Sequence, residues 1–158
     1  GYSMKNRVMT QTLIKSGTEP NLTADQEEHF FTYSLYPHAG TWREAGTEQE
    51  ALNLNVPAKA VAGAAEKDRM EFLSVDKRDV VLETVKKAED GDGVIVRLYE
   101  VENARTKVTL HCAEAIASAE ETDLLENPIE GALGVKENEI ELTIKPYEIR
   151  TIRIRTAK

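Results

Sequence analysis

Hydrophobic and polar residues alternate along much of the second half of this chain. The alternation is cleanest at residues 106–113 and 139–145. Side chains of a β-strand point alternately to its two faces, so this pattern predicts two strands that each bury one face. The residues expected to face inward are Val108, Leu110, Cys112, Ile140, Leu142 and Ile144.

A β-hairpin is predicted just before these two strands in the sequence. The sequence EDGDG at residues 89–93 is a strong turn signal between two β-rich runs. It predicts that residues 79–86 pair with residues 94–101.

The last third of the chain contains one clear strand and one ambiguous stretch. Residues 148–155 predict the final strand, in which a change of parity after Ile149 predicts a bulge near Arg150 and Thr151. Residues 114–127 show no clear period. The anchors expected in that stretch are Ile116, Leu124 and Leu125.

The sequence HFFTYSLYPHAGTW at residues 29–42 joins a predicted strand to a predicted helix. The strand carries aromatic side chains on both parities, so we expect it to be covered on both faces. Pro37 cannot donate to a ladder and ends the strand. Thr41 and Glu44 match the capping box that satisfies free N–H groups at a helix start, which predicts a helix over residues 42–54.

These elements predict an all-β fold class, an antiparallel β-sandwich with one short helix near residues 42–54. Further strands are expected at residues 7–15 and 70–75. A chain of 158 residues is long enough to bury its own core. We therefore assign residues 1–158 to a single domain.

The charge and the cysteine content narrow the class of partner. The formal net charge of −8 argues against nucleic acid, whose affinity depends on Lys and Arg contacts with phosphates, and against an anionic membrane surface. No apolar run approaches the about 20 residues that span a bilayer, and we expect no signal peptide. The single cysteine, Cys112, fits a cytoplasmic location.

The residues alone specify no catalytic or metal site. His29, His38 and His111 show no metal-ligand spacing, and we interpret His29 and His111 as structural or surface residues. His38 would either bond to a sugar hydroxyl or stabilise its turn, and we favour the turn. Cys112 lies on an inward parity, where a thiol behaves as a small hydrophobic residue. No spacing specifies the pair of carboxylates that glycoside hydrolysis requires.

Four aromatic residues leave a choice between a sugar-binding platform and core packing. These residues are Tyr33, Tyr36, Trp42 and Tyr99. Their strand and helix spacing favours core packing.

Several segments, in order along the chain, resemble one known family. They are TLIKS at residues 12–16, YSLYPHAGTW at 33–42, VLETVKKAEDG at 81–91, VRLYE at 96–100 and KPYEIRT at 145–151. Each is similar to a segment near the C-terminal end of family 38 glycoside hydrolases, the zinc-dependent α-mannosidases. The resemblance covers nearly the whole chain.

The resemblance implies that this chain is the C-terminal β-sandwich region of a retaining, zinc-dependent α-mannosidase. In that family the zinc ligands, the nucleophile and the acid/base lie in an N-terminal domain whose motifs are missing here. We therefore expect no catalytic residue and no metal ligand in this chain, with zinc in the absent catalytic domain. The expected partners are the catalytic and other domains of the same polypeptide. His38 and Trp42 are the candidate substrate-binding residues, at the rim of the cleft.

Two alternative functions stay open. A carbohydrate-binding module would bind mannose-containing glycans by itself, and exposed coplanar aromatic rings would favour it. A subunit-assembly domain would make contacts in a homo-oligomer. If the chain instead supports a catalytic domain, it should expose an apolar patch where its partner domains pack.

Overall fold

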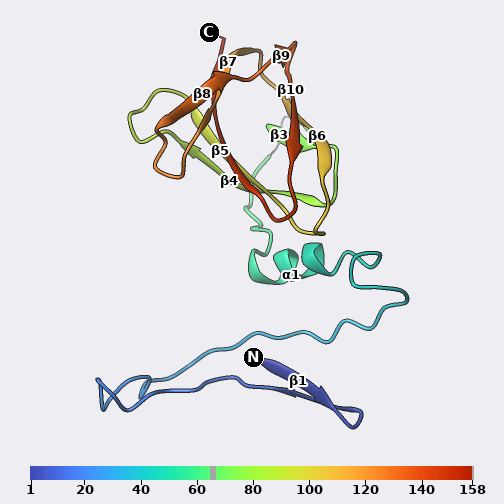
Figure 1. The fold of residues 1–158 in the computed structure, drawn as a ribbon, viewed down its shortest axis with the longest axis vertical. Coiled ribbons are helices and arrows are strands. Elements are labelled where there is room, and N and C mark those ends of the chain that lie inside the picture. The colour runs from blue at the N-terminus through green and yellow to red at the C-terminus, as the bar shows by residue number, and fades with distance from the viewer. Residues whose placement is uncertain (65–66, 158) are drawn as a thin grey trace.

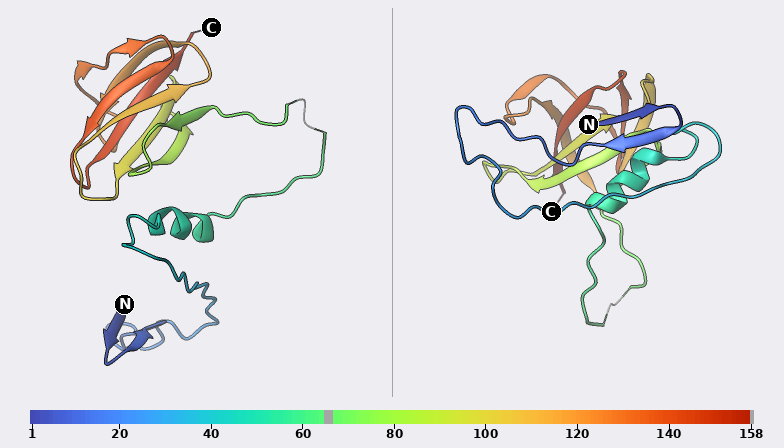
Figure 2. Two further views of the ribbon diagram at one scale, coloured as in Figure 1. Left: turned by 90° about the vertical axis from the view of Figure 1, so that its right-hand side faces the viewer. Right: turned by 90° about the horizontal axis from the view of Figure 1, so that it is seen from below.

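The computed structural model describes residues 1–64 and 67–157. The C-terminal half is an antiparallel β-sandwich, and the N-terminal half extends away from it and contains one helix (Figures 1 and 2). This arrangement confirms the predicted all-β fold class with one short helix. We call residues 1–46 the arm.

The arm contains a short hairpin, and the helix and the sandwich follow it. The hairpin and helix bounds are β1 Tyr2–Lys5, β2 Val8–Gln11 and α1 Thr47–Asn55. The sandwich strands are β3 Leu73–Val75, β4 Val80–Lys87, β5 Val94–Glu100, β6 Thr106–Cys112, β7 Ile116–Thr122, β8 Pro128–Ala132, β9 Val135–Lys136, β10 Glu139–Ile144 and β11 Ile149–Thr156. The prediction of a single domain over residues 1–158 stays a prediction. The sandwich strands themselves begin at Leu73.

Two antiparallel sheets form the sandwich, with the strand orders β3-β6-β10-β9 and β4-β5-β11-β7-β8. The predicted hairpin is confirmed as β4–β5, and its turn is closed by the Ala88 N–H, which donates to the Gly93 carbonyl at 3.0 Å. Gly93 has a φ of 97°, and a Cβ there would lie 2.6 Å from the Ile154 carbonyl oxygen. Glycine is therefore required on both grounds.

The core between the sheets is built from the alternating positions. All six residues predicted to face inward on the strands at 106–113 and 139–145 are buried. They pack with apolar side chains of the other sheet, which include Val96, Leu98, Ile152 and Ile154. The local alternation was therefore sufficient to predict this core.

The predicted bulge near Arg150 and Thr151 is wrong. Strand β11 pairs with β5 without interruption from Ile149 to Ile154, and its register shifts instead between Arg155 and Thr156, against β7. The reason is that β11 lies in the middle of its sheet and is buried on both faces. Apolar side chains of either parity can therefore be buried along β11 without a bulge.

Arg153 shows how the outer face of β11 is covered. Its guanidinium is only 6% exposed and donates to Asp90 Oδ2 at 2.5 Å and to the Glu126 carbonyl at 3.3 Å. These partners come from the β4–β5 turn and from the loop after β7. Paired and hydrogen-bonded in this way, the charge can be buried at an interior position.

Leu124 and Leu125 are not core anchors as expected. Their side chains are 60% and 83% exposed. The carboxylate of Asp123 accepts the N–H groups of Leu125 and Asn127 at 2.8 and 2.9 Å, and this turn ends β7 before the leucines.

The predicted strand over residues 29–36 is also wrong for this structure. The segment is extended and exposed, and within the described part of the chain it has no ladder partner. Tyr33, Tyr36 and Trp42 are exposed, and Tyr99 is half-buried, so the expected core packing of these aromatics is not found. The reason is non-local: a strand needs neighbours, and the sandwich sheets are complete without this segment.

Glu100 joins the two turns at one end of the sandwich. Its carboxylate is 1% exposed and accepts the N–H groups of Glu102 and Ala104 on Oε1 and that of Tyr147 on Oε2, at 2.7, 3.0 and 2.9 Å. Burial alone would raise the pKa of Glu100, but these backbone hydrogen bonds outweigh it and lower the pKa below its usual value. The ionised form is therefore the one that stabilises the fold.

Replacing Glu100 with Gln should lower the free energy of unfolding by about 1–3 kcal/mol near neutral pH, because buried N–H groups lose a charged acceptor. The folded pKa is depressed, so the stabilisation is present above the usual pKa of a glutamate and is lost as the pH falls through the folded pKa. Urea unfolding at several pH values measures both effects. Glu102→Gln is the control, since the Glu102 side chain forms a long ion pair of 3.7 Å with the exposed Arg78. An equal loss in both variants would contradict this role of Glu100.

The contrast between the core and the arm gives a second prediction. Leu110→Ala should cost about 2–5 kcal/mol of unfolding free energy, because Leu110 is fully buried. Leu35→Ala, at an arm side chain that is 78% exposed, should change it by less than about 0.5 kcal/mol. Chemical unfolding of the two variants measures the difference, and equal destabilisation would show that the arm packs in a core.

Candidate functional site

The two candidate residues, His38 and Trp42, lie in one turn. The Tyr36 hydroxyl donates to the Ala45 carbonyl at 3.1 Å across this turn. The ring of His38 lies 5.5 Å from that of Tyr36 at an angle of 41°, and its Nδ1 lies 3.2 Å from the Ala39 carbonyl oxygen. The contacts of His38 are therefore local ones that stabilise the turn.

The predicted capping box forms, but it does not start the helix. The Thr41 N–H donates to Glu44 Oε2 at 2.7 Å, and the Glu44 N–H donates to Thr41 Oγ1 at 3.3 Å. These bonds from Thr41 also hold the pKa of the Glu44 carboxyl below its usual value. Gly46 then adopts a left-handed φ of 65°, so the box closes an isolated turn and α1 begins only at Thr47. The predicted start at residue 42 is therefore too early.

Trp42 is partly covered by a neighbouring cation. The guanidinium of Arg43 lies 4.9 Å from the centroid of the indole ring, a cation–π arrangement. Trp42 also lines a cavity of about 270 Å³ together with Arg78 and Val101 of the sandwich. His38 is not among the described residues that line this cavity, so the structure does not bring both candidates into one cavity.

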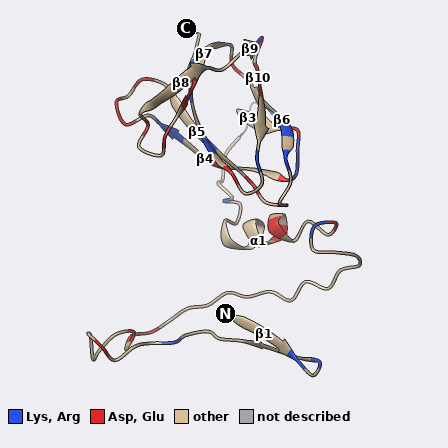
Figure 3. Ribbon diagram, viewed as in Figure 1, with Lys and Arg blue, Asp and Glu red and all other residues tan. Residues whose placement is uncertain are grey.

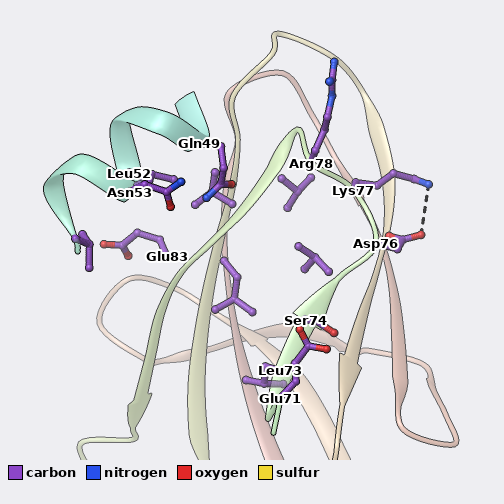
Figure 4. Close-up of a pocket in the computed structure, with 15 residues that line it drawn as sticks. Gln49, Leu52, Asn53, Glu71, Leu73, Ser74, Asp76, Lys77, Arg78 and Glu83 are labelled. Atoms are coloured by element: carbon purple, nitrogen blue, oxygen red, sulfur yellow. Dashed lines mark ion pairs between the residues drawn. The ribbon is translucent and has the colours of Figure 1, made fainter. Parts of the chain in front are cut away.

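A larger cleft of about 700 Å³ lies between α1 and strands β3 and β4 (Figure 4). The helix side contributes Leu52 and the following Val56. The sandwich side mixes polar and charged residues with apolar ones, which are Leu73, Val75, Val80, Val81 and Leu82. No pattern in the sequence indicates this cleft, because Leu52 is visibly apolar but the sequence does not say which surface it faces.

The polar groups of this cleft have structural partners. Asp76 accepts the Thr109 N–H at 2.7 Å and pairs with Lys77 at 3.4 Å. The bond from Thr109 contributes most to a pKa of Asp76 below its usual value. Asp76 is therefore an ionised anchor of strand β6 and not a general acid. No histidine or cysteine is among the described residues that line this cleft, so a nucleophile activated by a histidine is not found there.

The histidines lie in separate places. His29 Nε2 lies 3.0 Å from the Asp25 carbonyl oxygen, and His111 Nδ1 lies 3.2 Å from Glu139 Oε1 across β6 and β10. Within residues 1–64 and 67–157, no group of three or more His, Cys, Asp or Glu side chains is placed to hold a metal ion. Among the helices described, none is long and apolar enough to cross a membrane.

The most extensive unassigned feature is an exposed apolar surface on the arm. We call it the apolar arm surface, and it consists of Tyr2, Met4, Met9, Leu13, Ile14, Phe30, Phe31, Tyr33, Leu35 and Tyr36. Such a surface is what the support of a catalytic domain requires. These apolar positions are visible in the sequence, but their pattern predicts buried side chains and not an exposed surface.

The architecture defines the class of protein, an antiparallel β-sandwich with an exposed apolar extension. Residues 79–152 match the family model described as the glycosyl hydrolases family 38 C-terminal beta sandwich domain. This part of the chain, residues 79–152, thus belongs to the C-terminal β-sandwich domains of family 38.

The curated relatives carry the name α-mannosidase. Alpha-mannosidase 2C1 of Mus musculus is 35% identical over 159 residues, and that of Homo sapiens is 33% identical over 158 residues; each match covers 96% of this chain. Alpha-mannosidase G of Dictyostelium discoideum is 32% identical over 164 residues, or 97% of this chain. The chain spans only 15% of the length of each of these relatives.

Proposed function

We propose that this chain is the non-catalytic C-terminal β region of an α-mannosidase, and that it packs against and supports the catalytic domain of the same polypeptide. The names of the relatives support the activity of the intact protein. The small share of each relative that this chain covers supports a separate location for the catalytic residues. The intact enzyme would be a retaining glycosidase.

One observation carries the supporting role. The sandwich has a filled core, whereas the arm exposes large apolar side chains such as Phe30 at 86% and Leu35 at 78%. Large apolar side chains exposed in such number along one segment are typical of an interaction site. A scaffold that joins other domains accounts for both parts of the chain.

In this proposal the zinc site lies in another domain of the intact protein. Zinc sites use closely placed His, Cys, Asp or Glu donors, and the described residues form no such group. In our proposal the metal and the reacting carboxylates lie in the catalytic domain, and we assign no catalytic step to this chain.

The carbohydrate-binding module remains the second candidate, because Tyr33, Tyr36 and Trp42 are exposed. Their arrangement is less favourable to a flat sugar platform. The Tyr36 ring is tilted against His38, and Arg43 lies over Trp42. A module would also leave the apolar residues of the hairpin without a role.

Activity measurements test the proposal. With zinc present, this chain alone should show no hydrolysis of an aryl α-mannoside, because we place the catalytic residues in another domain of the polypeptide. The full-length polypeptide that contains it should be active, and deletion of residues 79–152 should abolish soluble, active enzyme.

A sugar titration of this chain serves as the control for the second candidate. Saturable NMR shifts at His38 and Trp42 with mannose or an α-linked mannobiose would favour a binding module. Turnover by this chain alone would contradict the supporting role.

A further inference from the structure

The arm contains a long segment without charge. Residues 29–42 include no Lys, Arg, Asp or Glu, although these residues make up 30% of the chain. In Figure 3 this part of the arm is uniformly tan, whereas charged residues are distributed over the sandwich. A run of this kind is typical of buried chain, yet here it lies on the surface.

Residues 29–36 have the properties of an interior strand that lacks its neighbours. Phe31, Tyr33 and Leu35 lie on one parity, which is apolar. The other parity has an aromatic residue at each end, with Thr32 and Ser34 between Phe30 and Tyr36. Within the described part of the chain, the segment makes no backbone–backbone hydrogen bond. Buried backbone N–H and C=O groups require hydrogen-bond partners. As an interior strand, this segment therefore lacks both packing partners for its side chains and hydrogen-bond partners for its backbone.

The β1–β2 hairpin is exposed on both faces, and its two faces differ in polarity. Tyr2 lies opposite Gln11, and Met4 lies opposite Met9, so these residues share one face. The other face carries a hydrogen bond of 2.7 Å between the hydroxyls of Ser3 and Thr10. An isolated two-stranded hairpin is marginally stable in water, and an apolar face packed on another layer supplies what it lacks.

The sandwich of this chain does not supply these neighbours. Its core is filled by its own strands, and the hairpin and the extended segment after it lie away from the sandwich in Figure 1 and in the left view of Figure 2. The relatives match nearly the whole of this chain, including the arm, although the family model covers only residues 79–152. Most of each relative lies outside the match, so ample polypeptide is available as a partner.

From these observations we infer that the arm completes a β-sheet of the polypeptide that precedes this chain in the intact protein. Residues 29–36 form an interior strand of that sheet, paired on both edges and covered on both faces. The hairpin packs its Tyr2 and Met9 face on the same domain. The inference rests on the proposed function, because it identifies the partner of the supporting arm as a β-domain of the same polypeptide.

Amide hydrogen exchange tests the inference. In the full-length polypeptide, the amides of residues 29–36 should exchange at least about 100-fold more slowly than in this chain alone, because a paired interior strand opens only with its sheet. In this chain alone they should exchange as freely as an unstructured segment. Fast exchange in the full-length protein would overturn the inference.

A pair of proline variants of the full-length protein provides a second readout. Thr32→Pro removes a ladder donor in the middle of the segment and should lower the thermal unfolding temperature and the protection of its neighbours. Thr18→Pro, in the exposed loop after β2, is the matched control and should leave both unchanged. Equal effects of the two variants would count against strand pairing.

Two further outcomes separate the alternatives. Protection of residues 29–36 in this chain alone that increases with protein concentration would identify a second copy as the partner and overturn the inference. Mannoside turnover by this chain alone would defeat the proposed function whatever the exchange shows. Fast exchange of residues 29–36 in an active full-length enzyme would defeat only the strand inference.

Discussion

Each apolar strand face must be packed against other side chains, and this requirement determines the structure of this chain. Alternation places apolar side chains on defined faces, and each such face must be removed from water for the strand to be stable. Between the two sheets this requirement is met by residues such as Leu110 and Ile152, which are fully buried. On the arm it is not met, and the same kind of sequence forms no sheet beyond one short hairpin. One constraint thus explains an ordered sandwich and a bare extension in the same polypeptide.

Buried charges complete the sandwich where apolar packing ends. Glu100 ties two turns together through backbone N–H groups, and Arg153 connects a central strand to two neighbouring loops. Both groups are ionised and have hydrogen-bonding partners, so their burial fixes the geometry of the sandwich ends. These interactions support the fold, and neither group faces a cleft with catalytic chemistry.

The sequence predicted those parts of the molecule that depend on local patterns. The strands with Leu110 and Ile140 and the hairpin at residues 89–93 followed from alternation and turn chemistry, which act within a few residues. The position of Leu124 and the start of α1 were predicted wrongly, because a side-chain turn at Asp123 and the left-handed Gly46 ended or delayed each element.

The candidate site was predictable only as a turn. Its capping box at Thr41 and Glu44 was visible in the sequence and forms in the structure. Whether His38 and Trp42 contact a sugar depends on polypeptide outside this chain, which no local pattern describes. The strand over residues 29–36 was wrong here for the same reason, since its pattern is strand-like but its partners are absent.

Limited trypsin digestion of this chain tests the central claim most directly, that the sandwich is complete and the arm is bare. The arm carries exposed cleavage sites at Lys5, Arg7, Lys15 and Arg43. We predict rapid loss of the arm and a resistant fragment that begins after Lys67 or Arg69 and unfolds with the same free energy as the whole chain. An arm that resists cleavage, or a fragment that is unfolded, would contradict this account.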